Sequence, residues 1–249
     1  MIKQFCIFIL AMPLLFLSCD IVEGGGSDGS SSSSGKTESQ KNGIVTFYTT
    51  YNEDSVAYYT PELENGWYKC AVSENKLSEF PPQSAAKITH NGKTIRVLVT
   101  DLCPNAGNSQ WTSKSNYFFD LAENAFAALD DKVKGYLDDV SIQRIAYETN
   151  KNIKFAVKDG SSQYWLGGRF YNMRYPLAKV EYSSNGNTFK EMEKLDGNKN
   201  NWWVIKSGND LFSNLQFRLT DVYGNTITCA AISKLSVGGN YDLGKNFSY

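Results

Sequence analysis

Hydrophobic and polar residues alternate along this chain in short segments that are separated by turn residues. The clearest segment is Val97–Cys103, in which odd- and even-numbered side chains point to opposite faces, as in a β-strand. The alternation puts Asp101 on the same face as Val97 and Val99, at the end of the strand. Pro104 ends the segment because proline has no backbone N–H to donate within a sheet. Short alternating segments with frequent turn residues predict a mostly β protein.

The first half of the chain predicts further strands and one helix. The Asn91-Gly92 pair between two alternating segments predicts a β-hairpin. Hydrophobic residues at helical spacing predict a helix over 121–129 that starts at Asp120 or Ser115. The remaining strand candidates are residues 43–50, 67–72, 85–88 and 138–147.

The second half, residues 151–249, carries alternating segments that are typical of a small β-sandwich. Turns are predicted at Asp159-Gly160, Asn185-Gly186 and Tyr223-Gly224-Asn225.

One segment of this half, Ser161–Tyr171, has a distinctive face. Alternation puts Trp165, Arg169 and Tyr171 on that face. Tyr164, Leu166 and Phe170 take the other face. A face of Trp, Tyr and Arg suits stacking against sugar rings, whose C–H groups pack on aromatic side chains.

Charge and histidine content narrow the classes of function. Residues 43–150 carry 9 Lys/Arg and 14 Asp/Glu, whereas residues 151–249 carry 13 and 8, so the halves have net charges of −5 and +5. This split indicates two modules with different partners, or simply two solvated surfaces. The single histidine, His90, argues against a His-based triad and a His-rich metal site. No motif supports a metal or another cofactor, and scattered basic residues without a known motif argue against nucleic acid.

The N-terminus predicts export and a lipid anchor. Residues 1–18 combine a basic start, a short apolar core and a small residue at the end, as a signal peptide does. Phe16-Leu-Ser-Cys19 resembles a bacterial lipobox, which makes Cys19 the expected lipid attachment site. The alternative is an ordinary signal peptide that is cut nearby. Residues 19–42 are rich in Gly and Ser and predict a disordered tether.

The cysteines that remain after export allow one disulfide in the first half of the chain. An exported protein can oxidise its thiols. Cys70 and Cys103 both lie in the first half, and we expect them to pair. Cys229 lies in an apolar strand and is expected to be a buried free thiol.

Two carboxylates lie in apolar surroundings and are candidates for chemistry. Asp101 follows a β-branched strand, and Asp120 lies in Tyr117–Leu121. Loss of hydration there tends to raise a carboxyl pKa. The structural alternatives remain open: Asp101 caps backbone N–H groups at the strand end, and Asp120 is the N-cap of the following helix.

Several motifs follow one another along both halves of the chain: Gly43–Tyr48, Val97–Pro104, Phe118–Phe126, Val157–Trp165, Arg174–Pro176 and Met192–Asp196. In this order and at this spacing, they resemble the motifs of bacterial expansins. The resemblance covers nearly everything after residue 42. It implies a six-stranded double-psi β-barrel over residues 43–150 and an immunoglobulin-like β-sandwich, a carbohydrate-binding module, over residues 151–249.

The resemblance also implies a groove in the barrel. Thr46 and Asp101 correspond to groove residues of the family, and Asp120 corresponds to the general acid of related endoglucanases. Cys103 replaces a tyrosine of the best-known bacterial expansins, so that Tyr48 or Trp111 would have to supply the missing aromatic contact.

No second catalytic group is identifiable in the sequence. The base of the related endoglucanases lies on an early loop that expansins lack, and no motif supports Glu53 or Asp54 in that role. The resemblance therefore implies that the protein is not an ordinary hydrolase.

In the second half, the resemblance implies a line of glycan-binding residues. Tyr164 and Trp165 fall on this line, although alternation supports only one of them without a bulge. Trp202 is expected to be exposed and Trp203 to be in the core. Lys158 matches a lysine that contacts polysaccharide in the family. The alternative for the aromatic residues is ordinary core packing.

The combined expectation is a monomeric cell-surface or secreted lipoprotein that binds cellulose, hemicellulose or peptidoglycan. It would loosen glycan contacts without cutting them and would touch the membrane only through its lipid. The alternatives are a weak endoglucanase, a peptidoglycan lytic transglycosylase and a carbohydrate-binding adhesin with an inert barrel.

Overall fold

The computed structural model describes residues 36–49, 58, 62–113 and 117–249 of the 249-residue chain. The signal peptide, the lipid attachment site Cys19 and most of the tether therefore lie outside the described residues, as do Glu53, Asp54 and Ser115. In the described part of the chain, no helix is long and apolar enough to cross a membrane.

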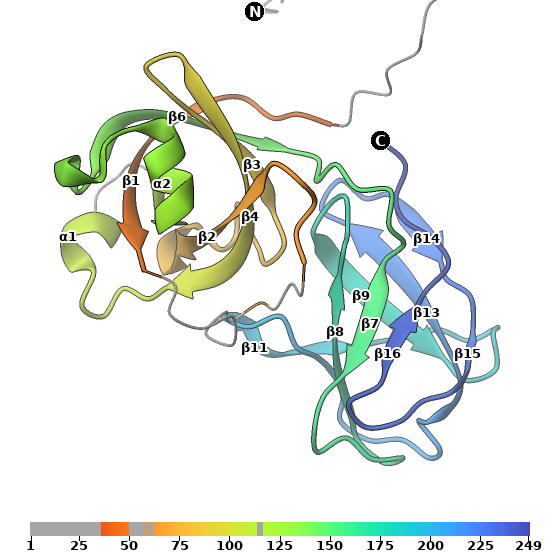
Figure 1. Ribbon diagram of the computed structural model, residues 1–249. Coiled ribbons are helices and arrows are strands. Elements are labelled where there is room, and N and C mark those ends of the chain that lie inside the picture. Colours follow the sequence, from red (N-terminus) through yellow and green to blue (C-terminus); the bar gives the residue numbers. More distant parts are fainter. Residues whose placement is uncertain (1–35, 50–57, 59–61, 114–116) are drawn as a thin grey trace, which may run out of the picture. The chain divides into compact units, whose positions relative to one another are not determined.

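Six strands of the first half form a closed barrel in the order β1-β5-β2-β4-β3-β6 (Figure 1). The pairs β1/β5 and β2/β4 are parallel, and the other neighbours are antiparallel. The strands are β1 (Lys41–Tyr48), β2 (Trp67–Ser73), β3 (Ala85–His90), β4 (Lys93–Cys103), β5 (Tyr117–Ala122) and β6 (Leu137–Ile145). The first two residues of β1, Lys41 and Asn42, fall within the segment predicted to be a disordered tether, so the tether was predicted too long.

Short helices complete the barrel. The helices are α1 (Ser109–Thr112), α2 (Glu123–Leu129) and the 3₁₀ turns η2 (Glu74–Lys76) and η3 (Lys132–Lys134). The helix α2 packs against β1, β2, β4 and β5 and adds Phe126 and Leu129 to the barrel core. The predicted helix start was wrong by two residues, because Asp120, Leu121 and Ala122 extend β5.

The predicted hairpin at Asn91-Gly92 is confirmed, and it joins β3 to β4. Both turn residues have positive φ, 46° and 77°, which suits a two-residue hairpin turn. The neighbouring His90 is buried, and its Nε2 lies 3.0 Å from Oδ2 of Asp130. The only histidine thus supports the hairpin base.

The second half forms two five-stranded sheets with an apolar core between them. One sheet has the order β10-β9-β13-β14 with β15 also on β13, and the other has the order β11-β12-β8-β7-β16. The barrel followed by a β-sandwich confirms the predicted mostly β fold. The strands are β7 (Lys154–Val157), β8 (Leu166–Tyr171), β9 (Leu177–Ser183), β10 (Lys190–Glu191), β11 (Glu193–Asn198), β12 (Trp203–Ile205), β13 (Ser213–Asp221), β14 (Thr226–Thr228), β15 (Ile232–Lys234) and β16 (Asn240–Asp242).

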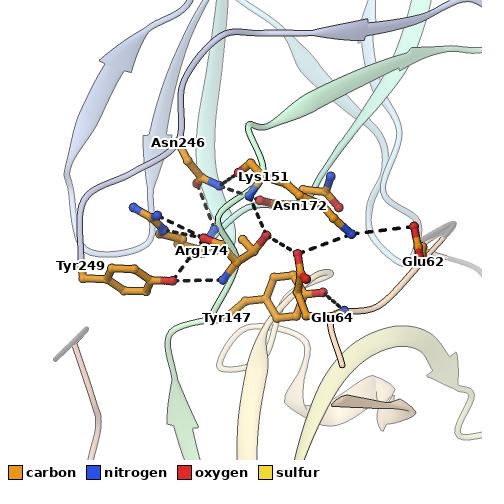
Figure 2. A network of polar contacts seen from close by, with 9 residues as sticks. Glu62, Glu64, Tyr147, Lys151, Asn172, Arg174, Asn246 and Tyr249 are labelled. Carbon is orange, nitrogen blue, oxygen red and sulfur yellow. Dashed lines mark hydrogen bonds and ion pairs between the residues drawn. The ribbon is translucent and has the colours of Figure 1, made fainter. Parts of the chain in front are cut away.

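A polar network ties the segment between barrel and sandwich to both of them (Figure 2). Thr149 is buried, its hydroxyl donates to Glu64 at 2.7 Å, and its N–H donates to Oη of Tyr249 at 3.0 Å. The Nε of Arg174 donates to the carbonyl of Thr149 at 3.2 Å, and its Nη1 donates to the carbonyl of Phe247 at 2.7 Å. These contacts fix the connecting segment against the C-terminal residues.

The predicted Cys70–Cys103 disulfide is wrong. The three cysteines in the described part of the chain, Cys70, Cys103 and Cys229, are free and buried. In the β2/β4 register, Cys70 lies opposite Val99 and Cys103 lies opposite Ser73. An offset of three residues is about 10 Å along a strand, whereas a disulfide needs Cα atoms within about 7 Å. The free thiol predicted at Cys229 is confirmed.

Candidate functional site

A row of side chains crosses four neighbouring strands of the barrel and brings the two predicted acids to one level. Thr46 on β1 lies opposite Asp120 on β5, and Asp120 lies opposite Ala71 on β2. Ala71 in turn lies opposite Asp101 on β4. Because the strands are ordered β1-β5-β2-β4, the side chains follow one another across the sheet as Thr46, Asp120, Ala71 and Asp101. With strands about 4.8 Å apart, the backbones of the two acids are about 10 Å from each other.

A β-bulge on β4 puts Asp101 in this row. The register passes from Cys70/Val99 to Ala71/Asp101 and leaves Thr100 as an extra residue. Val99 belongs to the barrel core, whereas Ala71 belongs to a separate outer cluster. The bulge thus turns Asp101 to the outer face, so the prediction that Asp101 shares a face with Val97 and Val99 was wrong.

Asp120 is held by Thr46 and is not a helix cap. The hydroxyl of Thr46 donates to Oδ1 of Asp120 at 2.5 Å. The N-cap of α2 is Ala122, so the structural alternative for Asp120 is ruled out. Burial raises the pKa of the Asp120 carboxyl, the Thr46 hydrogen bond lowers it, and the charge of Asp101 raises it further, with a net rise.

Asp101 accepts a hydrogen bond from the backbone N–H of the next residue, Leu102, at 2.8 Å. Capping a backbone N–H at the end of the strand is the structural alternative that the sequence analysis left open for Asp101. The fully buried Tyr58 has a pKa raised first by burial and then by the charges of Asp101 and Glu74, so its phenol stays protonated beside Asp101. No sequence signal pointed to Tyr58, because nothing in the pattern of hydrophobic and polar residues around it marks it as a site residue.

Aromatic side chains flank the row on its outer face. Phe118, two residues before Asp120, packs in a small cluster with Cys103, and Tyr48 and Trp111 lie against this cluster. The indole of Trp111 is nearly parallel to the Phe118 ring, at 6.2 Å and 17°. Both candidates for the aromatic contact missing at Cys103 therefore lie beside the acids.

The phenol of Tyr48 and the thiol of Cys103 remain protonated in this setting. Burial raises the pKa of Tyr48, and the charges of Asp101 and Asp120 add to the rise. The buried Tyr48 Oη has no hydrogen-bond partner among the described residues. Burial, with Asp120 and Asp101, also raises the pKa of Cys103 to about 12, which leaves its thiol unreactive.

We expect Asp120→Asn to stabilise the protein at neutral pH. The native carboxyl binds its proton more tightly than the unfolded one, so the stability that Asp120 contributes falls as the pH rises through its raised native pKa. Asparagine keeps an acceptor for the Thr46 hydroxyl and avoids the buried charge. Thermal unfolding at neutral pH should show a Tm higher by about 2–4 °C. The gain should vanish below about pH 4, where the Asp120 carboxyl is protonated in both the folded and the unfolded protein.

The matched control is Asp138→Asn, since Asp138 is an exposed aspartate on β6 of the same barrel. It should leave the Tm unchanged. A lower Tm for Asp120→Asn at every pH would show that the charged form of the Thr46 hydrogen bond outweighs the cost of burial.

On the sandwich, the indole of Trp165 lies over the backbone of β8. A Cβ on Gly167 would come within 2.8 Å of Cη2 and 3.0 Å of Cζ3 of Trp165. Only glycine leaves room for the ring to rest this close to the sheet. Trp165 is half-buried and Tyr164 is 58 % exposed. Two aromatic side chains therefore lie at the surface at the start of β8.

The loop before β8 explains how both aromatic residues reach the surface. The strand begins at Leu166, so the strand predicted from Ser161 was too long. The hydroxyl of Ser162 accepts hydrogen bonds from the N–H groups of Tyr164 at 3.2 Å and Trp165 at 3.3 Å. Because this turn replaces the strand pleat, alternation does not apply to Tyr164 and Trp165, and no bulge is needed.

Trp202 and Trp203 follow the predicted division only in part, since Trp202 was expected to be exposed. Trp203 is only 4 % exposed and belongs to the sandwich core, whereas Trp202 is half-buried. Trp202 lines a surface depression of about 290 Å³ together with Lys158, Asp159 and Arg169. Arg169, which alternation placed on the same face as Trp165, thus lies beside Trp202.

In the part of the chain that the structure describes, no group of three or more His, Cys, Asp or Glu residues is arranged to hold an ion.

The fold and the surfaces define the class of this protein. A barrel with an outward row of acids and aromatics, followed by a sandwich with surface Trp and Tyr, is a two-module β protein suited to polymeric sugars. No family model matches the chain. Sequence comparison nevertheless finds expansins.

Expansin-like protein 1 of Dictyostelium discoideum is 24% identical over 263 residues, with 99% of this chain and 82% of that protein covered. Expansin-like protein 5 of the same organism is 27% identical over 82% of this chain and 84% of its own length. Expansin-YoaJ of Bacillus subtilis is 28% identical over 67% of this chain and 61% of its own length.

The solved structures agree with this assignment at the level of the fold. The crystal structure of the Clavibacter michiganensis expansin matches with a TM-score of 0.69 and 22% identity, covering 84% of this chain and 98% of the other. A mutant of that expansin, solved in complex with cellohexaose, matches with the same TM-score and 21% identity. The resemblance to expansins that the motifs indicated is thereby confirmed, in sequence by these relatives and in fold by the solved structures.

Proposed function

We propose that this protein binds cellulose and related wall polysaccharides and loosens the non-covalent contacts between their chains without cutting them. The observation that carries the proposal is the indole of Trp165, which lies over Gly167 at the surface of β8. A ring that lies across a sheet offers its outer face to a sugar ring, and Tyr164 extends this surface by one aromatic side chain. The cellohexaose complex of the Clavibacter expansin mutant supports the choice of a β-glucan.

The barrel would act on the bound chain through Thr46, Asp101 and Asp120. Polymer hydroxyl groups would replace water at this row and exchange hydrogen bonds with the two carboxyl groups. Such contacts compete with those that hold one glycan chain to the next, and no bond has to break.

A second candidate function is glycan cleavage, and the raised pKa of Asp120 favours it. A carboxyl whose pKa is raised holds its proton more tightly than an ordinary aspartate, as a general acid must. A weak endoglucanase would also need a base on the other side of the bond, whereas a peptidoglycan lytic transglycosylase would need one acid/base group. The third candidate is an adhesin in which the sandwich binds and the barrel is inert.

Export and anchoring complete the proposal. Residues 1–18 would direct secretion, and a lipid on Cys19 would hold the protein at the membrane surface by a flexible tether. The free thiols of Cys70 and Cys103 do not conflict with export, because both are buried and protonated. We propose that the exported protein acts as a monomer.

The proposal is tested by pull-down on crystalline cellulose and on purified peptidoglycan, with mass spectrometry of both supernatants. Binding to cellulose without soluble sugars is the expected result. Oligosaccharides or anhydro-muropeptides that disappear in Asp101→Asn or Asp120→Asn would overturn it and make the protein an enzyme.

A further inference from the structure

The last part of the predicted tether binds to the folded protein. The sequence predicts a disordered segment over residues 19–42, but the residues just before β1 form specific contacts. The backbone N–H of Glu38 donates to the carbonyl of Arg144 on β6 at 3.0 Å. The side-chain amide of Gln143, also on β6, donates to the carbonyl of Glu38 at 2.8 Å. The segment therefore stays on β6 beyond the first residue of β1.

The guanidinium of Arg144 is the barrel side of this contact. Arg144 is only 9 % exposed, and its Nη2 forms an ion pair with Oε1 of Glu38. Its Nη1 donates to the backbone carbonyl of Glu79. A cation that has lost most of its hydration needs a carboxylate beside it, and the segment before β1 supplies that carboxylate.

The same segment also reaches the sandwich. The backbone N–H of Lys36 donates to Oη of Tyr175 at 2.9 Å, and Tyr175 is a buried residue of the sandwich core. Nζ of Lys36 lies 5.0 Å from the ring centroid of Tyr223, in the turn between β13 and β14. The guanidinium carbon of Arg144 lies 5.4 Å from the same centroid. Both distances are within the roughly 6 Å range of a cation–π contact, so this ring of the sandwich receives a cation from β6 and a cation from the segment.

We infer that residues 36–38 are a clasp that ties the barrel to the sandwich, and that Lys36 and Glu38 are positioning residues for the joint action of the two modules. Modules joined by a linker move relative to each other unless further contacts hold them. The network of Figure 2 holds the connecting segment after β6, whereas the clasp adds a link from the segment that precedes the barrel.

The consequence for wall loosening rests on the proposed function. The barrel would have to act on a glycan chain that the sandwich holds. Two groups that work on one substrate lose effectiveness when their relative position is not fixed. The clasp would therefore matter for loosening and much less for binding, which the sandwich carries by itself.

Hydrogen exchange of the full-length protein tests the clasp directly. The amides of Lys36 and Glu38 should exchange about tenfold more slowly than those of an unstructured peptide, because both are donors in these contacts. In Glu38→Ala this protection should be lost, since Arg144 loses its carboxylate. Glu38→Gln keeps an acceptor and should retain part of the protection. Tyr223→Leu should remove the protection at Lys36 although it changes only the sandwich, and Tyr223→Phe, which keeps the ring, should preserve it.

The matched control is Glu191→Ala, which removes an exposed glutamate from β10 and should leave both amides protected. Free exchange of both amides in the natural protein would overturn the clasp. Full protection of Lys36 in Tyr223→Leu would overturn it as well, because the segment would then be bound by the barrel alone.

Extension of wall strips under constant load tests the positioning role. Glu38→Ala should loosen walls about fivefold less than the natural protein, while cellulose binding stays within about twofold, and Glu38→Gln should recover part of the loss. Glu191→Ala should loosen walls normally. Equal loosening by Glu38→Ala and the natural protein would contradict the positioning role. Absence of loosening in the natural protein would instead overturn the proposed function, and hydrogen exchange would still decide whether the clasp exists.

Discussion

Trp165→Ala is expected to release the protein from crystalline cellulose, with an affinity about 10- to 100-fold lower than that of the natural chain. The indole lies over Gly167 and offers its face to a sugar ring. Central aromatic residues of this kind each contribute about 2 kcal/mol or more to binding, and about 1.4 kcal/mol corresponds to a factor of ten. Depletion isotherms on cellulose measure the change directly.

A control keeps this result specific. Phe189→Ala removes a half-buried aromatic ring from the opposite side of the sandwich, where Arg218 lies 4.3 Å from its centroid. This variant should bind cellulose as the natural protein does, and Trp165→Tyr should recover much of the affinity. Full binding by Trp165→Ala, with an unchanged Tm, would show that cellulose binds to a different surface of the protein.

Asp101→Asn is expected to abolish wall loosening while cellulose binding stays within about twofold of normal, because binding is carried by a different module. The substitution keeps the size of the side chain and an acceptor for the Leu102 N–H. It removes the negative charge from the row of Thr46, Asp120, Ala71 and Asp101. Loss of one charged hydrogen-bonding partner costs about 1.5–3 kcal/mol, which is at least a tenfold loss of activity. Extension of cellulose paper or wall strips under constant load is the measurement.

The paired control is again Asp138→Asn, an exposed aspartate of the same barrel that should loosen walls normally. Normal loosening by Asp101→Asn would mean that the barrel is inert and that the protein is an adhesin. An enzyme would be favoured if the natural protein loosened walls and also released sugars, and if Asp101→Asn did neither.

The sequence alone determined the architecture and most of the sandwich surface. Alternating segments and turn pairs such as Asn91-Gly92 predicted the β fold, because a period of two and a positive-φ turn are local properties. The helix predicted over 121–129 was found two residues shorter, since element ends depend on neighbours. The family motifs added Thr46, Asp101 and Asp120, which the structure places in one row.

Only the tertiary structure decided which side chains point into the core, which point outward and which of them meet. The bulge at Thr100 moves Asp101 from the core face to the outer face, and a bulge depends on the register of two strands distant in sequence. The same register separates Cys70 from Cys103, so two cysteines in one module cannot bond. Arg169, which alternation placed on one face with Trp165, meets Trp202 only because β8 and β12 pair. Local pattern fixes what each segment is, and pairing between segments fixes which side chains meet.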